Sequence, residues 1–99
     1  MIQRRLIFTA VARTEVIDAI GWYERHAPTI VLRLRVELRA IVRRITDNPL
    51  QFPGGPGGTR RALVRHFPYF VIFRVAESTI QVVAFFHTSR DPEHLSPRQ

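Results

Sequence analysis

Apolar positions recur along this chain with two different periods, and these periods predict a short strand, two helices and three further strands. Leu6 to Phe8 form a short apolar run, and Thr9 follows with a hydroxyl that can cap a helix. Apolar residues then recur every three or four positions until Pro28, which disfavours helical angles at the residue before it. The stripe of this first helix consists of Ala12, Val16, Ala19, Ile20 and Tyr23.

The segment from Thr29 to Asp47 fits both periods. Residues 32–39 alternate as a strand does, whereas a helical stripe runs through most of the segment. We predict a helix, because the segment contains no Gly or Pro and is rich in Leu, Arg, Glu and Ala. The apolar stripe of this second helix consists of Val31, Leu34, Leu38, Ile41 and Ile45.

Three arginines recur at every fourth position of this second helix, at Arg35, Arg39 and Arg43. Like charges at this spacing repel each other by about 0.2–0.5 kcal/mol per pair. A partner lying across the helix would relieve that repulsion. We therefore interpret the three arginines as a candidate surface for an acidic or amphipathic protein segment.

A glycine-rich loop and three strands are predicted after the second helix, which ends at Asn48-Pro49. The loop is not a phosphate-binding loop, because a Walker-type loop ends in Gly-Lys-Ser/Thr and opens a helix, whereas Thr59-Arg60-Arg61 leads into a strand. The strands are expected over 60–66, 69–75 and 80–87, joined by short turns into a meander.

The predicted elements follow the order β-α-α-β-β-β. This order indicates an α+β fold in which a small antiparallel sheet packs on a two-helix hairpin. Ninety-nine residues suffice for one two-layer core, so residues 1–99 are expected to form a single domain.

The alternation along each strand assigns its side chains to one of the two faces of this sheet. One face is almost wholly apolar and is expected to pack on the helices. Its residues are Ala62, Val64, Tyr69, Val71, Phe73, Val75, Ile80, Val82, Ala84 and Phe86. The other face is half apolar and half cationic, and we interpret it, with its rim, as a target-binding surface. The candidate target-binding residues are Arg60, Arg61, Arg65, Arg74, His87 and Arg90.

Charge supports anionic partners for this surface. All fifteen basic side chains are arginines, and against eight carboxylates they give a formal net charge of +7. Arginine suits two-point contacts with phosphate or carboxylate, so nucleic acid and acidic protein are both candidates. A GC-rich genome explains the choice of Arg over Lys equally well, but it does not explain the excess of charge. No apolar run is long enough for a signal peptide or a membrane span, so the cytoplasm is the expected location.

RNA cleavage is one activity that the cationic face could perform. Attack by the ribose 2′-hydroxyl needs no metal, and arginine can stabilise the charge that develops on the phosphorus. The catalytic candidates are Arg61, Arg65 and Arg74, with His87 as the proton carrier. The alternative is a solvated face whose arginines provide solubility and protect the sheet edges. No metal or other cofactor is expected, because cysteine is absent and the histidines form no ligand pattern.

Short motifs spread over nearly the whole chain are characteristic in combination. They are Trp22-Tyr23, Asn48-Pro49, Arg60-Arg61, Phe67-Pro68-Tyr69 before Val71 to Val75, and His87-x-x-Arg90-x-Pro92. With the element order, they resemble the RelE/ParE toxin superfamily, the toxins of bacterial type II toxin-antitoxin pairs. The resemblance implies a cognate antitoxin, encoded next to this gene, that forms a hetero-oligomer with the toxin. An antitoxin segment is expected across Arg35, Arg39 and Arg43 or across the sheet face.

The superfamily divides by target. RelE-like members cut messenger RNA in the ribosome, whereas ParE-like members inhibit DNA gyrase by binding. The RNA-cleaving branch usually has a basic residue after the tyrosine of the turn, and a basic residue and a tyrosine in the tail. By this resemblance, Phe70 and Pro92 occupy the positions of the two basic residues in this chain, and no tyrosine follows Tyr69. The resemblance therefore favours a ParE-like toxin that binds its target and is not an enzyme; the alternatives are a metal-independent, ribosome-dependent endoribonuclease and an inactive antitoxin-binding domain.

Overall fold

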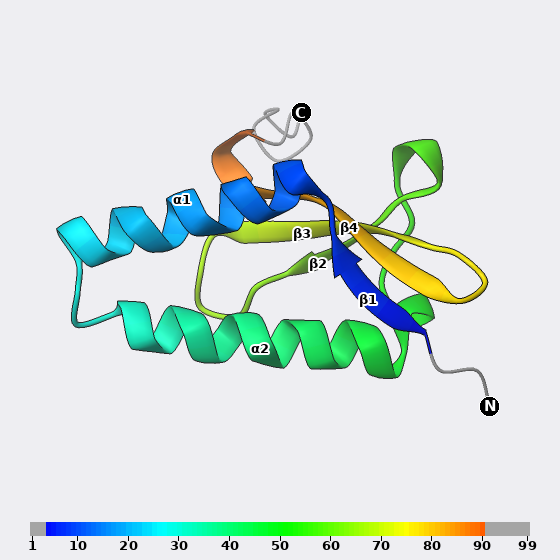
Figure 1. The fold of residues 1–99 in the computed structure, drawn as a ribbon, viewed down its shortest axis with the longest axis horizontal. Helices are drawn as coiled ribbons and strands as arrows, with labels where there is room; N and C mark the ends of the chain where they lie inside the picture. The colour runs from blue at the N-terminus through cyan, green and yellow to red at the C-terminus, as the bar shows by residue number, and fades with distance from the viewer. Residues whose placement is uncertain (1–3, 91–99) are drawn as a thin grey trace, which may run out of the picture.

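The computed structural model describes residues 4–90 and follows the predicted order of elements. Its helices and longer strands are β1 (Arg5–Phe8), α1 (Ala10–His26), α2 (Val31–Asp47), β2 (Arg60–Leu63), β3 (Tyr69–Val75) and β4 (Thr79–His87). Short 3-10 helices lie at η1 (Pro49–Gln51), η2 (Pro56–Gly58) and η3 (Thr88–Arg90). Figure 1 shows α1 and α2 as a hairpin beside the sheet. The predicted α+β class and the order β-α-α-β-β-β are confirmed.

The sheet has the strand order β1-β4-β3-β2. Strands β2, β3 and β4 form the predicted antiparallel meander, whereas β1 lies parallel to β4, with Arg5 beside Thr79 and Phe8 beside Val82. Strands joined by a tight hairpin must be antiparallel, but β1 is joined to the rest of the sheet through two helices and is free of that constraint. The sheet is therefore mixed, and the prediction of an antiparallel sheet holds for β2, β3 and β4 but not for β1.

The core lies between the helical hairpin and one face of the sheet. Both predicted helical stripes are confirmed: they are buried or packed against the core, apart from Val31 at the start of α2. The helical period of residues 31–47 thus prevails over the strand-like alternation of 32–39. Neither α1 nor α2, the helices of residues 4–90, is long and apolar enough to cross a bilayer. The fully buried large side chains are Leu34, Ile45, Val64, Phe73, Ile80 and Val82.

Thr9 fixes the start of α1, as its position in the sequence predicts. Its hydroxyl accepts a hydrogen bond from the backbone N–H of Ala12 at 3.1 Å. Since a cap of this kind contributes about 1 kcal/mol, we expect Thr9→Ala to lower the free energy of unfolding by about that amount in a chemical denaturation experiment. Thr9→Ser keeps the hydroxyl and should be nearly neutral. Equal losses in the two variants would show that the hydroxyl does not stabilise the helix.

A bulge in β4 interrupts its pairing with β3. Ile72 pairs with Ala84, but the next residue, Phe73, pairs with Val82, so that Val83 is an additional residue in β4. One additional residue inverts the alternation of side chains along a strand. Every side chain of β4 after the bulge therefore lies on the face opposite to the one predicted.

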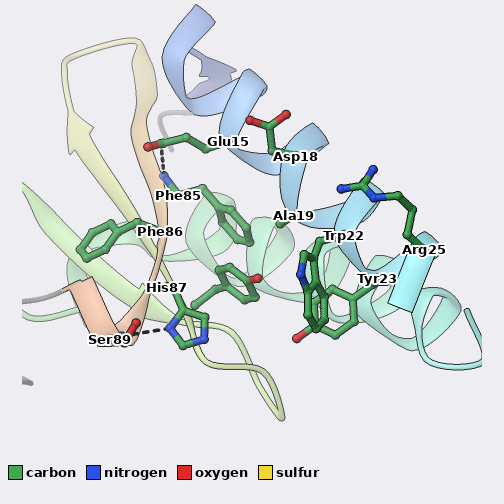
Figure 2. A pocket seen from close by; sticks show the side chains of 11 residues that line it. Glu15, Asp18, Ala19, Trp22, Tyr23, Arg25, Phe85, Phe86, His87 and Ser89 are labelled. Carbon is green, nitrogen blue, oxygen red and sulfur yellow. Dashed lines mark hydrogen bonds between the residues drawn. The ribbon is translucent and has the colours of Figure 1, made fainter. Parts of the chain in front are cut away.

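The predicted faces are consequently wrong for the end of β4. Phe85, expected on the face without helices, is buried with 2% of its surface exposed, and its ring stacks on Tyr69 with centroids 4.7 Å apart. His87 also lies on the helix side, with its ring edge-on to Tyr69 at 5.3 Å. Ala84 and Phe86, expected in the core, lie on the other face instead. In Figure 2, Phe86 points away from Phe85 and His87.

Strand β2 is shorter than predicted, because the chain turns after Val64 instead of continuing to residue 66. The backbone N–H of Phe67 bonds to the carbonyl of Val64 at 3.4 Å, and His66 has a φ of 68°. A backbone in this left-handed region belongs to a tight turn and not to a strand. Arg65 is therefore an exposed turn residue and does not share a strand face with Arg61.

Candidate functional site

The sheet face without helices combines apolar and cationic side chains, and we call it the open face. Phe70 and Phe86 lie side by side on the two central strands, with ring centroids 6.0 Å apart. The guanidinium of Arg61 lies over the Phe70 ring at 4.7 Å, where the π electrons attract its charge. The residues of the open face are Arg5, Ile7, Arg61, Leu63, Phe70, Ile72, Arg74, Thr79, Gln81, Ala84 and Phe86.

Arg74 lies at the end of the open face next to the glycine-rich loop. Its Nε donates a hydrogen bond to the carbonyl of Gly57 at 3.3 Å. Gly57 has a φ of 68°, which favours glycine because a Cβ is strained there. The side chain of Arg74 is nevertheless exposed, so its guanidinium remains accessible to an anionic partner.

The structure brings together only part of the predicted target-binding set. Arg61 and Arg74 share the open face, as predicted. Arg65 is exposed in the turn between β2 and β3. The backbone of Arg90 closes η3, but its side chain is outside the described residues, so its role stays a prediction.

Arg60 and His87 do not belong to the open face. Arg60 pairs with the buried Phe73, so its side chain turns to the helix side, where it donates a hydrogen bond to the carbonyl of Phe52 at 2.6 Å. Its role is to tie the loop to the sheet. His87 lies on the helix side because of the bulge in β4. The predicted grouping of His87 with Arg61 and Arg74 is therefore wrong.

The open face lacks the proton carrier that the RNA-cleavage hypothesis requires. With His87 on the opposite side, the residues of the open face are arginine, glutamine, threonine and apolar side chains, none of which exchanges a proton readily near neutral pH. Within residues 4–90, no three His, Asp or Glu side chains come together as a possible metal site. The arrangement supports binding of a partner with anionic and apolar groups.

The outer side of α2 carries the three predicted arginines, all of them exposed. Arg35 is ion-paired with Glu24 of α1 at 3.2 Å, whereas Arg39 and Arg43 have no ion pair with any described residue. Leu32 and Val36 lie on the same side at helical spacing, with 71% and 53% of their surfaces exposed. We call this surface the outer face of α2; it comprises Leu32, Arg35, Val36, Arg39 and Arg43.

A groove of about 530 Å³ lies on the helix side of the sheet, between α1 and the end of β4 (Figure 2). Sequence reasoning missed it, because residues about seventy positions apart meet there. The one signal in the sequence is Trp22, which lies beside the apolar stripe of α1 and is exposed in the structure. The residues that define the groove include Glu15, Asp18, Trp22, Tyr69, Phe85 and His87.

Comparison with known proteins identifies the family to which this chain belongs. The model of the ParE toxin of the type II toxin-antitoxin system parDE matches residues 6–92. No curated protein sequence matches the chain significantly. A solved structure of the chromosomal ParDE TA system from P. aeruginosa is similar at 20% sequence identity and a TM-score of 0.73, covering 86% of this chain and 96% of that chain, and supports the fold. Because the family model spans most of the chain, this protein belongs to the ParE toxin family of type II toxin-antitoxin systems.

Proposed function

We propose that this toxin arrests growth in the cytoplasm by binding DNA gyrase through its open face, and that a cognate antitoxin neutralises it. Family membership supports the toxin class and an antitoxin partner. The observation that carries the mode of action is the composition of the open face. Arg61 and Arg74 flank apolar side chains, of which Leu63 is 53% exposed, and no proton carrier lies among them. Exposed apolar groups with arginine are typical of protein interfaces.

The endoribonuclease alternative is weakened by the same observation. Cleavage by the 2′-hydroxyl needs groups that accept and donate protons beside the phosphate. The bulge in β4 places the one predicted carrier, His87, on the side of the sheet opposite Arg61 and Arg74. Target binding is therefore the function that this geometry supports best.

Growth and nucleic acids after induction test this function. The protein is induced alone and together with the product of the neighbouring gene. We expect growth arrest and loss of negative supercoiling with intact transcripts, and recovery when the neighbour is co-expressed. Rapid cleavage of transcripts would establish the endoribonuclease instead. Normal growth of cells that contain the folded protein would establish an inactive antitoxin-binding domain.

The outer face of α2 is the proposed contact for the antitoxin. An amphipathic segment with acidic residues would cover Leu32 and Val36 and neutralise Arg39 and Arg43. Apolar anchors and charges of one sign alternate on this helix side, so an acidic helix with matching spacing complements it.

Charge reversal on the outer face of α2 is expected to weaken antitoxin binding. For Arg39→Glu combined with Arg43→Glu we expect a loss of about 10- to 100-fold in affinity, measured by titration calorimetry, since opposing charges cost a few kcal/mol at an interface. The control combines Arg13→Glu with Arg65→Glu, two exposed arginines outside α2 and the open face, and changes the net charge equally. Equal losses in both double variants would show that only the total charge matters.

A further inference from the structure

The outer edge of β4 is covered by β1 along only half of its length. Pairing with β1 runs from Thr79 to Val82, and then β1 ends. Among residues 4–90, no strand lies on that side of β4 from Val83 to His87. An uncovered strand edge presents backbone N–H and carbonyl groups to which another strand can pair.

Glu15 of α1 occupies this edge with its side chain. Its carboxylate accepts a hydrogen bond from the backbone N–H of Phe85 at 2.8 Å (Figure 2). That N–H therefore points away from β3, and the alternation of a strand turns the N–H of His87 in the same direction. The Glu15 carboxylate lies where the backbone carbonyl of an added strand would lie. A side chain can leave this position when a strand enters.

The groove beside this edge has the chemistry of a peptide site. Trp22 lines it, and although one face of its ring stacks on His26, 47% of its surface is exposed, so the groove offers apolar surface beside the buried Phe85. Glu15 and Asp18 make one end acidic, although the chain carries a net charge of +7, whereas Arg25 lies toward the other end (Figure 2). The acidic end of the groove therefore favours a ligand in which a basic residue stands next to an apolar one.

We propose that the free edge of β4 and the groove bind an extended basic and apolar segment of the antitoxin. The segment pairs with β4 on the same edge as β1, beyond the point where β1 ends. One of its backbone carbonyls replaces the Glu15 carboxylate as the acceptor for the N–H of Phe85. An apolar side chain enters beside Trp22, and a lysine or arginine lies at Asp18. This inference rests on the proposed function for the source of the segment. It adds a contact that differs in charge from the outer face of α2, which takes acidic residues.

Three blocked seven-residue peptides test the inference on the full-length protein. The first alternates lysine and leucine, the second has glutamate in place of lysine, and the third is the first with a central proline, which cannot pair as a strand. Backbone amide shifts are followed by NMR during titration. We expect the lysine peptide to shift the amides of Phe85 and His87 and to bind at least about tenfold more tightly than the others. Tighter binding of the glutamate peptide, undiminished binding of the proline peptide, or shifts confined to other elements would overturn the inference.

A charge variant and the free protein complete the test. We expect Asp18→Asn to weaken the lysine peptide about fivefold at low salt, and the control Asp47→Asn, at the exposed end of α2, to leave it unchanged. Amide shifts of Phe85 that change with protein concentration would assign the groove to a second copy. Nuclear Overhauser contacts between residues 91–99 and Trp22 would assign it to the chain's own end. Either result would overturn the inference.

Peptide binding and toxicity can fail independently. A chain that does not arrest growth but binds the lysine peptide at Phe85 retains the strand site and contradicts only the proposed function. A chain that arrests growth without binding the peptide at this edge retains the toxin function and contradicts only the strand site.

Discussion

Combined charge reversal of Arg61 and Arg74 is expected to abolish growth arrest. Both guanidinium groups lie on the open face beside its apolar side chains, and Arg61 is held over the Phe70 ring. Arginines beside apolar anchors are frequent binding hot spots, and a carboxylate in their place leaves an unpaired charge at the interface. For Arg61→Glu combined with Arg74→Glu we therefore expect gyrase affinity to fall about 100-fold or more. Viable counts after induction, compared at equal protein levels, should then show that the cells survive.

Two control variants locate the effect on the open face. Arg39→Glu with Arg43→Glu makes the same change in net charge on α2 and should leave growth arrest intact. His87→Ala should also remain toxic, because the bulge places this residue on the other side of the sheet. Full toxicity of the Arg61 and Arg74 double variant, or loss of toxicity in His87→Ala, would contradict the assignment of the open face.

Truncation of Phe73 is expected to have the largest effect on stability. The side chain is fully buried on a central strand, and its ring is edge-on to Phe52 with centroids 5.8 Å apart. Phe→Ala at such a site costs about 3–5 kcal/mol through lost burial and a remaining cavity. Since small domains are stable by about 5–15 kcal/mol in total, we expect Phe73→Ala to populate the unfolded state substantially.

Denaturant unfolding followed by circular dichroism measures this effect. Leu63→Ala provides the control, because this residue is 53% exposed on the same sheet and should change the free energy of unfolding by at most about 0.5 kcal/mol. Similar losses in Phe73→Ala and Leu63→Ala would show that the buried face of the sheet does not form the core.

Those elements with strong local signals were predictable from the sequence. The cap at Thr9, the helical stripe of α1 and the arginine row of α2 each depend on residues within a few turns of one helix. The choice of helix for residues 31–47 was also correct, because propensity over seventeen residues outweighed a short alternation. Arg61 and Arg74 were placed correctly, since regular strands surround both residues.

The bulge could not be predicted from the sequence, and the reason is physical. From Val82 to Phe86 every residue is apolar, so no polar side chain marks which face is solvated and no break in the alternation is visible. The additional residue at Val83 then reversed the faces of all residues that follow, His87 among them. A single residue thus removed the predicted proton carrier from the face that carries Arg61 and Arg74.

The groove also lay beyond the reach of the sequence. Glu15 lies on α1 and Phe85 on β4, and only the packing of the helix across the sheet brings the carboxylate to the backbone N–H. Neither residue carries a local motif. The turn at His66 was missed as well, because histidine is not a residue that a left-handed backbone favours.

DNA supercoiling by purified gyrase is the decisive assay for target binding through the open face. The assay compares the purified toxin with the double variant Arg61→Glu and Arg74→Glu over a range of concentrations. We expect the toxin to inhibit supercoiling in a dose-dependent manner and the variant to leave supercoiling unchanged. Unchanged supercoiling with the folded toxin, together with cleavage of messenger RNA on translating ribosomes, would contradict gyrase binding through the open face.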